Sequence, residues 1–333
     1  MKKYLLPENC NFYKANLHSH TNWSDGYISP EEMKKIYKDN GYSIISFTDH
    51  NGLFAHYELD EDDFLTIPGF EIDLNRTHGT DYADCETAHF CCYPRDRENF
   101  TQPGLDVNYR VPKMRWSVDE DKRVLMRPDG EAFNRGDYST ENVNACLKLL
   151  RDKNFIITYN HPCWSVENYP KYIRYTEIDN LEVYNHGCFV AGWDEHCGHV
   201  YDDFLREGKM IKCVATDDNH GPHDMCGGFT MFCAEKLTHE AIIDAFDKGN
   251  FYCSTGPEIT SLYFEDGKIH IETKEKCDII RLVTGHRRAA MVRNEDHASF
   301  SVHPECKYVR IEVVNGIYRA YTNAYPVSTL FAE

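Results

Sequence analysis

The chain has 333 residues and a formal net charge of -18 at pH 7, and its length suits one large barrel with an appendage. The acidic balance argues against stable nucleic-acid binding, because phosphate backbones are bound by clustered Lys and Arg. It does not argue against a small phosphorylated substrate, because bound metal ions can reverse the local field.

The first ten residues and the cysteines bear on the compartment. Only Leu5 and Leu6 form an aliphatic pair before Pro7, so no signal-peptide core is predicted. No apolar stretch approaches the roughly 20 residues that span a bilayer, and no membrane association is expected. In a chain this long with no predicted export signal, we interpret the 14 cysteines as reduced thiols of a cytoplasmic protein. None of them lies in a C-x-x-C pair.

Short apolar runs alternate with amphipathic stretches from residue 12 to about residue 255, which indicates a parallel sheet or barrel. The helix at residues 30–40 is well marked, because Ser29, Pro30 and Glu32 form a capping box and Gly41 suits its end. Further helices are predicted at residues 141–153, 194–207 and 240–248. Strands are predicted at residues 12–17, 43–47, 64–67, 89–93, 155–159, 181–184 and 211–215.

Two segments depart from this alternation. Residues 94 to about 138 lack clean periodicity, and we interpret them as an insertion that either covers the site or is a surface excursion. Beyond residue 255, turn pairs such as Asp266-Gly267 indicate hairpins, and no helix is predicted. We expect residues 256–333 to form a small all-β domain that braces residues 1–255. Its strands are predicted at residues 259–264, 268–273, 279–284, 298–302, 308–314 and 318–322.

Histidines and carboxylates gather at the carboxyl ends of the predicted α/β strands, where parallel architectures place their active sites. Residues i and i+2 of a strand point to one side, so His18 and His20 can bind one ion together. A carboxylate such as Glu71 can bridge two ions. Imidazole and carboxylate donors suit Zn, Mn or Fe, and such ions activate water for attack at phosphorus.

Four segments resemble the motifs of the PHP (polymerase and histidinol phosphatase) superfamily of metal-dependent phosphoesterases. Residues 18–26, with His18, His20 and Asp25, are similar to the first motif. Residues 48–51, 160–162 and 218–220 are similar to the second, third and fourth. The resemblance covers about 250 residues. It implies a distorted (β/α)7 TIM-like barrel of seven strands and seven helices, in a family in which many members hold three metal ions.

The resemblance also implies a set of ligands for two or three divalent transition metal ions (Zn, Mn or Fe). One ion would be held by His18, His20, Glu71 and Asp218. Glu71 would bridge to a second ion, completed by His89 and His161. A third would be held by Asp25, His50 and His220. Glu71, Asp218 and His220 are the residues that we expect to be catalytic.

Two assignments have alternatives, and one neighbouring residue has a separate role. Asp217 is the alternative to Asp218 in the fourth motif, although spacing favours Asp218. His78 competes with His89, which is preferred because an apolar strand follows it. Asp49 is expected to orient a ligand rather than bind metal itself.

The substrate site is less well marked in the sequence. Glu182 and Asn185 end a strand that faces the same mouth, so they line the substrate site or are surface polar residues. A phosphate clamp needs guanidinium groups, and the pattern does not choose among the candidates. These are Arg76, Arg95, Arg127 and Arg135.

The function predicted from these patterns is hydrolysis of a small phosphate ester, such as a nucleotide or a sugar phosphate, through metal-activated hydroxide. The alternatives are a metal-dependent amidohydrolase and a non-catalytic metal-binding module. Amidohydrolases often bridge their metals with a carbamylated lysine. Glu71 at the bridging place, with no lysine at a matching strand end, favours chemistry at phosphorus. The sequence does not indicate the oligomeric state.

Overall fold

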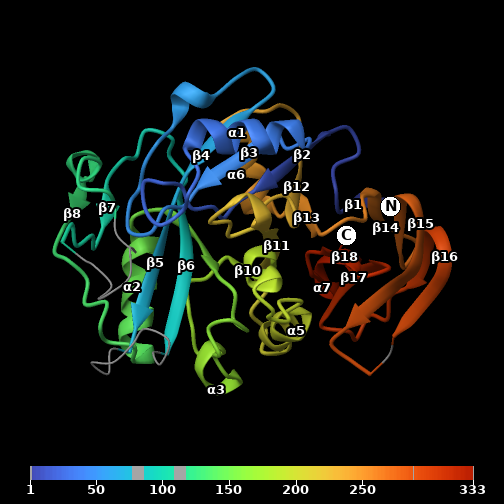
Figure 1. The fold of residues 1–333 in the computed structure, drawn as a ribbon. Helices are drawn as coiled ribbons and strands as arrows, with labels where there is room; N and C mark the ends of the chain where they lie inside the picture. Colours follow the sequence, from blue (N-terminus) through green and yellow to red (C-terminus); the bar gives the residue numbers. More distant parts are fainter. Residues whose placement is uncertain (1, 77–85, 109–117, 288, 333) are drawn as a thin grey trace.

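The computed structural model describes residues 2–76, 86–108, 118–287 and 289–332 as a mixed α/β molecule with a β-rich part (Figure 1). One sheet contains three parallel strands, β2 (Asn11–Asn16), β3 (Ile44–Phe47) and β4 (Leu65–Pro68). Two strands absent from the sequence prediction, β12 (Phe229–Ala234) and β13 (Phe251–Ser254), extend it antiparallel on the other side of β2. The prediction missed them because it followed the alternation of strands and helices that is typical of parallel sheets, whereas these two strands pair antiparallel.

A second sheet has the order β11-β10-β9-β6-β5. Its parallel strands are β9 (Phe155–Tyr159), β10 (Asn180–Asn185) and β11 (Lys212–Thr216). The other two, β5 (Phe70–Asn75) and β6 (Thr87–Pro94), pair antiparallel. β5 is a further strand that the sequence prediction lacks. Only Gly69 separates it from β4, so the sequence does not mark where one strand ends and the next begins.

The predicted seven-stranded barrel is not confirmed, because the described strands pair into two large open sheets and one separate two-stranded sheet rather than into one closed ladder. The sheets nevertheless meet at their edges. Ala215 N–H in β11 donates to the Thr230 hydroxyl in β12 (3.3 Å). On the other side, His50 and Glu71 form an isolated parallel bridge. The strand ends of both sheets therefore converge on one place.

Helices cover the outer faces of both sheets. α1 (Pro30–Asp39) packs on β3, α6 (His239–Lys248) on β12, α2 (Thr140–Asp152) on β9 and α5 (Gly198–Arg206) on β10 (Figure 1). The α1 boundaries follow the predicted capping box, since the Ser29 hydroxyl accepts from Glu32 N–H (3.3 Å). Within the described chain, none of the helices has the length and apolar character needed to cross a membrane.

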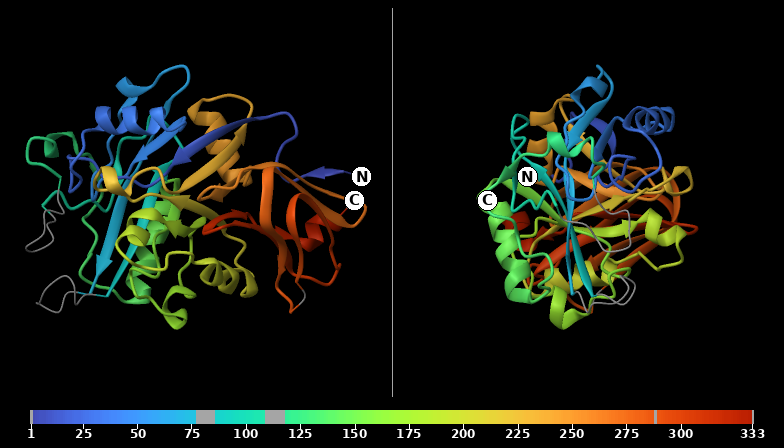
Figure 2. Two further views of the ribbon diagram at one scale, coloured as in Figure 1. Left: turned by 45° about the vertical axis from the view of Figure 1, so that its right-hand side comes forward. Right: turned by 60° about the vertical axis from the view of Figure 1, so that its left-hand side comes forward.

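The C-terminal part consists of antiparallel strands, seen beside the α/β part in the left view of Figure 2. They are β14 (Ile259–Glu265), β15 (Lys268–Thr284), β16 (Ala290–Ser301), β17 (Tyr308–Asn315), β18 (Tyr318–Thr322) and β19 (Tyr325–Pro326). The predicted turns hold, because Gly267 and Gly316 adopt φ of 75° and 60°. The absence of helix was predicted wrongly: α7 (Val327–Phe331) ends the chain.

The β-rich part continues the first sheet, because β18 pairs with β13. A buried ion pair also joins it to the α/β part. Arg310 of β17 is 2% exposed and donates from Nε and a terminal nitrogen to both oxygens of Asp202 in α5 (2.9 and 2.8 Å). The domain boundary at residue 255 remains a prediction.

The remaining described elements are short. They are β1 (Lys3–Tyr4), η1 (Tyr57–Leu59), β7 (Gln102–Pro103), η3 (Arg123–Leu125), β8 (Pro128–Asp129), α3 (Tyr169–Tyr172), α4 (His186–Val190) and η4 (Pro222–Asp224). The expectation of reduced cysteines is wrong for one pair: Cys10 and Cys233 form a disulfide, with Cα atoms 5.5 Å apart.

Candidate metal centre

His18 and His20 lie just beyond β2, where the backbone is fixed by a neighbouring loop. Asp218 N–H donates to the His18 carbonyl (2.9 Å), and His20 N–H donates to the Asn219 carbonyl (3.0 Å). Both imidazoles are fully buried, and their Nε2 atoms lie 3.1 Å apart. The two rings therefore reach one point, as the i, i+2 spacing predicts.

Asp218 and Glu71 complete the first donor group. Asp218 Oδ1 lies 3.2 Å from His18 Nε2 and 3.0 Å from His20 Nε2. The Glu71 oxygens lie 3.4 Å from the same two nitrogens. Donor atoms about 3 Å apart are spaced as they are around one ion with metal–ligand bonds of about 2 Å.

Glu71 also belongs to a second donor group. Its Oε1 lies 3.0 Å from His89 Nδ1 and 3.3 Å from His161 Nε2. Glu71 is in β5, His89 in β6 and His161 directly after β9, so adjacent strands of the second sheet supply all three. Asn160 positions the carboxylate by donating to Oε1 (2.8 Å).

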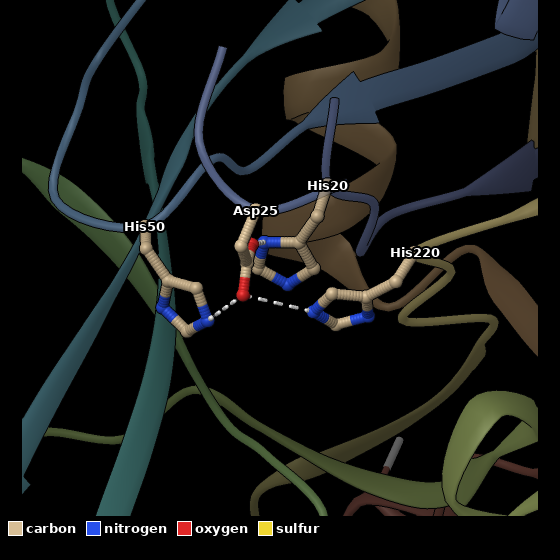
Figure 3. Close-up of side chains that lie close together, drawn as sticks. All are labelled: His20, Asp25, His50 and His220. Atoms are coloured by element: carbon tan, nitrogen blue, oxygen red, sulfur yellow. Dashed lines mark ion pairs between the residues drawn. The ribbon is translucent and has the colours of Figure 1, made fainter. Parts of the chain in front are cut away.

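A third group surrounds Asp25 (Figure 3). Asp25 Oδ2 lies 3.6 Å from His50 Nε2 and 3.3 Å from His220 Nε2. His20 Nδ1 lies 3.6 Å from the other oxygen. His20 thus presents Nε2 to the first group and Nδ1 to the third, a double placement that the sequence did not indicate.

The buried polar atoms of this site fit divalent cations. His20 Nδ1 and Asp25 Oδ2 are buried, and neither has a hydrogen-bond partner among the described residues. An unsatisfied buried polar atom is costly, and coordination to a cation would satisfy it. The donor set of imidazoles and carboxylates matches the borderline divalent metals.

Charges within the site keep its carboxylates ionised, and, against the opposing effect of burial, the same carboxylates raise the pKa of His161 to about 9 and the pKa of His220 to about 10 in the absence of a cation. Burial alone would raise the pKa of Glu71, but His18, His89 and His50 hold it well below its usual range. The same balance lowers the pKa of Asp218, through His18 and His20. Burial lowers the pKa of His50 to about 3, so its imidazole is neutral. Ionised carboxylates and a neutral imidazole are the forms that bind metal.

The two adjacent aspartates of the fourth motif point in different directions. Asp217 accepts from the Tyr37 hydroxyl (2.7 Å) and from the backbone N–H groups of Cys226 (2.6 Å) and Gly228 (2.7 Å). Asp218 adopts a φ of 51° and faces the imidazoles. The geometry therefore brings Asp218 among the donors and leaves Asp217 in a structural network.

Glu182 and Asn185 lie behind the donor groups rather than on the surface. Glu182 accepts from His18 Nδ1 (2.7 Å) and from His161 N–H (3.0 Å). A carboxylate at Nδ1 fixes the tautomer that leaves Nε2 free to bind metal. The Asn185 amide donates to Glu182 (3.0 Å) and to Asp218 (3.1 Å).

Asp49 fixes the loop that carries Asp25. It accepts from the backbone N–H and the hydroxyl of Thr21, both at 2.8 Å. Gly26 lets this loop fold back on itself, because a Cβ there would lie 2.1 Å from the His20 carbonyl oxygen. These contacts match the orienting role expected of Asp49.

Other candidates lie apart from these groups. His78, the alternative to His89, is outside the described residues. The four arginines considered as a phosphate clamp are engaged elsewhere. Arg76 pairs with Glu86, Arg95 with Asp247 and Arg135 with Asp73, while Arg127 lies over the Phe100 ring.

The sequence analysis missed cysteines near the site. Cys91 lies close to His18 and Glu71, but burial raises the pKa of its thiol to about 11 and keeps it protonated. Cys163 and Cys197 have sulfur atoms 2.9 Å apart, beside Glu195. The one available signal was that Cys163 directly follows the Asn-His-Pro motif.

The donor groups open into a cavity of about 500 Å³. Six of the predicted ligands line it, and aromatic and aliphatic side chains complete its wall. The six are His50, Glu71, His89, His161, Asp218 and His220. A small molecule entering the cavity therefore meets the donor atoms directly.

No protein-family profile matches the chain. Among curated proteins, it is 25% identical over 166 residues to the DNA polymerase/3'-5' exonuclease PolX of Bacillus subtilis (strain 168). The match covers 44% of this chain and only 29% of that protein.

Among solved structures, the chain matches a two-domain protein of Bacteroides vulgatus ATCC 8482, described as containing a predicted PHP-like metal-dependent phosphoesterase. This match covers 97% of each chain, with 13% identity and a TM-score of 0.47. A candidate metal-dependent phosphoesterase of Bifidobacterium adolescentis ATCC 15703 is 13% identical with a TM-score of 0.37, over 62% of this chain and 87% of that one. Both are described as metal-dependent phosphoesterases, the class whose motifs this chain resembles in sequence.

Proposed function

We propose that this chain is a metal-dependent phosphoesterase that hydrolyses a small phosphate ester. The observation that carries the proposal is the position of Glu71, which is 1% exposed at the centre of the donor groups. Its two oxygens lie within 3.4 Å of five imidazole nitrogens. These belong to His18, His20, His50, His89 and His161. One carboxylate so placed can link several cations.

Divalent ions in these groups supply Lewis-acid polarisation, an activated water nucleophile and charge stabilisation at phosphorus. The chain's own residues hold the donors in place. Glu182 fixes the ring of His18, Asn160 fixes Glu71, and Asp49 fixes the loop that carries Asp25. Such support from behind the ligands tunes metal affinity and geometry.

We propose two or three ions of Zn, Mn or Fe, since the three donor groups overlap through Glu71 and His20. Glu71, Asp218 and His220 are the proposed catalytic residues, because each faces both a donor group and the cavity. The proposed partner is a small phosphorylated molecule. Stable nucleic-acid binding is not expected from a net charge of -18.

The test combines metal content with hydrolysis. Protein purified without chelator should hold two to three equivalents of transition metal and release phosphate from some of a panel of phosphomonoesters and phosphodiesters. His18→Ala and Asp218→Ala should lose both properties, whereas Asp217→Asn should keep its metal. Less than one equivalent of metal contradicts the proposal. So does hydrolysis of esters or amides at carbon without hydrolysis at phosphorus.

A further inference from the structure

The cavity at the metal centre is lined by two chemically different sets of residues. One set is the donor groups. The other, the apolar wall, consists of apolar and aromatic residues beside them. These residues are Tyr27, Trp164, Val190 and Ala191.

The apolar wall is attached to the same loops as the metal ligands. Tyr27 follows Asp25 by two residues, and its N–H donates to the His220 carbonyl (2.8 Å). Trp164 packs its ring edge-on against His161, with centroids 4.9 Å apart. Val190 ends α4, which begins directly after Asn185. A molecule coordinated at the donor groups is therefore within reach of this wall.

The wall keeps apolar surface exposed. Tyr27 is 77% exposed and Val190 is 46% exposed, although both line a cavity. Large exposed apolar side chains beside convergent polar groups are typical of ligand sites. An aromatic ring in a ligand gains from stacking or edge contacts with Tyr27 and Trp164.

Charge limits what else the ligand can carry. Among the described residues that line the cavity there is no lysine or arginine. His223 also lines the cavity, but its Nε2 lies 3.9 Å from the carboxylate of Asp224, and this neighbouring negative charge would repel a phosphate. Cations at the donor groups can compensate one phosphate group. A second phosphate further along would face the apolar residues and Asp224, and none of the described lining residues is a lysine or arginine that could pair with it, so its desolvation would be costly.

We propose that the substrate is a monophosphate ester of an uncharged aromatic or apolar alcohol, held by Tyr27, Trp164 and Val190. This inference rests on the proposed phosphoesterase function and narrows its substrate class. Water forms a new P–O bond as the ester P–O bond breaks, the alcohol leaves with a proton, and inorganic phosphate is released. Sugar phosphates and bisphosphates are then poor substrates.

Binding tests the wall separately from chemistry, because phosphonates are not hydrolysed. Calorimetry on the metal-loaded full chain should show phenylphosphonate binding roughly tenfold more tightly than methylphosphonate. Tyr27→Ala should remove most of this difference, whereas the matched control Tyr27→Phe should keep it. Equal affinities for the two phosphonates, or a difference that survives in Tyr27→Ala and in Trp164→Ala, overturn the inference.

Rates of hydrolysis distinguish a wrong substrate class from a wrong phosphoesterase function. Phenyl phosphate should be hydrolysed with a higher kcat/KM than glycerol phosphate or a sugar bisphosphate. Val190→Lys, which adds a cation to the apolar wall, should shift preference toward the bisphosphate. Efficient hydrolysis of glycerol phosphate or a bisphosphate by the unmodified chain overturns the substrate class alone. Absence of hydrolysis for every phosphate ester overturns the phosphoesterase function and the inference together.

Discussion

Replacing Glu182 with Gln tests how far the residues behind the ligands control the metal centre. Glu182 Oε1 accepts from His18 Nδ1 (2.7 Å) and the Thr216 hydroxyl (2.8 Å). Oε2 accepts from His161 N–H (3.0 Å) and the Asn185 amide (3.0 Å). Both oxygens act as acceptors only. A Gln side chain of the same shape must turn a donor NH₂ toward one of these pairs of donors.

Either orientation of the amide breaks about two hydrogen bonds to a charged acceptor, each worth about 1.5–3 kcal/mol. If the NH₂ faces His18, that imidazole keeps a hydrogen bond only by moving its proton from Nδ1 to Nε2. Nε2 is the nitrogen that lies 3.2 Å from Asp218, so the ring stops being a ligand. We expect metal affinity to fall about 10–100-fold and the free energy of unfolding to fall by about 3–6 kcal/mol.

Competition against a chromophoric chelator measures the affinity, and circular dichroism checks the fold. Glu167→Gln is the matched control, because Glu167 also accepts several hydrogen bonds but lies outside the donor groups. Its carboxylate accepts from the hydroxyls of Tyr138, Tyr159 and Tyr175. The control should lower Tm and leave metal affinity unchanged. A folded Glu182→Gln variant with wild-type affinity would refute the reasoning.

Four further perturbations concern other buried charges. Asp218→Asn should lower the metal content, measured by mass spectrometry, by at least one equivalent. Asp217→Asn should keep the metal and instead lose about 1–3 kcal/mol of unfolding free energy in urea, because Asp217 accepts several hydrogen bonds. Arg310→Met should cost about 3–5 kcal/mol in the same assay, because it leaves the buried Asp202 with only the more distant cation of Arg206 (3.9 Å). Arg310→Met with Asp202→Leu should recover much of that loss. Burial raises the pKa of Glu195 from its ordinary 4.5 to about 7. Relative to Glu195→Gln, the wild-type chain should be most stable below about pH 4.5 and lose up to about 3 kcal/mol as the pH rises to about 7, because the folded state binds the proton more tightly than the unfolded state.

Each of these outcomes has a clear opposite. A metal-free Asp217→Asn beside a metal-replete Asp218→Asn would reverse their roles. A loss below about 1 kcal/mol for Arg310→Met would place this pair among weak surface ion pairs, despite its burial. Parallel stability curves for the wild-type chain and Glu195→Gln between pH 4.5 and 7 would contradict the raised pKa of Glu195.

Elements with strong local signals were predictable from the sequence. α1 begins at Pro30 because Ser29 caps it, and β9 has the bounds of its apolar run. The hairpin turn at Gly316 was marked by its Asn-Gly pair. In each case the deciding interactions lie within a few residues, so a local pattern contains them.

Features decided by distant contacts were not predictable. β5 runs directly on from β4 in the sequence, and its separate identity comes from pairing with β6. The split into two open sheets depends on where ladders stop, which no residue pattern states. The same holds for the long β15, which was predicted as two strands. In the structure it is one strand, and its pairing with β16 is irregular between Glu272 and Cys277.

The candidate site was more predictable than the fold around it. The nine expected ligands come together in space, because strand ends on one side of an α/β fold converge. Their metal binding remains a prediction. The double placement of His20 and the role of Glu182 behind His18 were beyond reach, because both depend on side-chain orientation. The backbone φ of 51° that turns Asp218 inward is likewise invisible in the sequence.

The pairing of β1 with β14 joins two segments that are far apart in the chain. Lys3 lies opposite Phe264 and Tyr4 opposite Tyr263, so the outer strand of the β-rich part is made long before its partner. At about 5–20 residues per second, a ribosome needs roughly 10 to 50 s to make this partner after β1. For that interval the first strand waits without its neighbour. The β-rich part expressed alone would show the bare edge of β14, which is a template for aggregation.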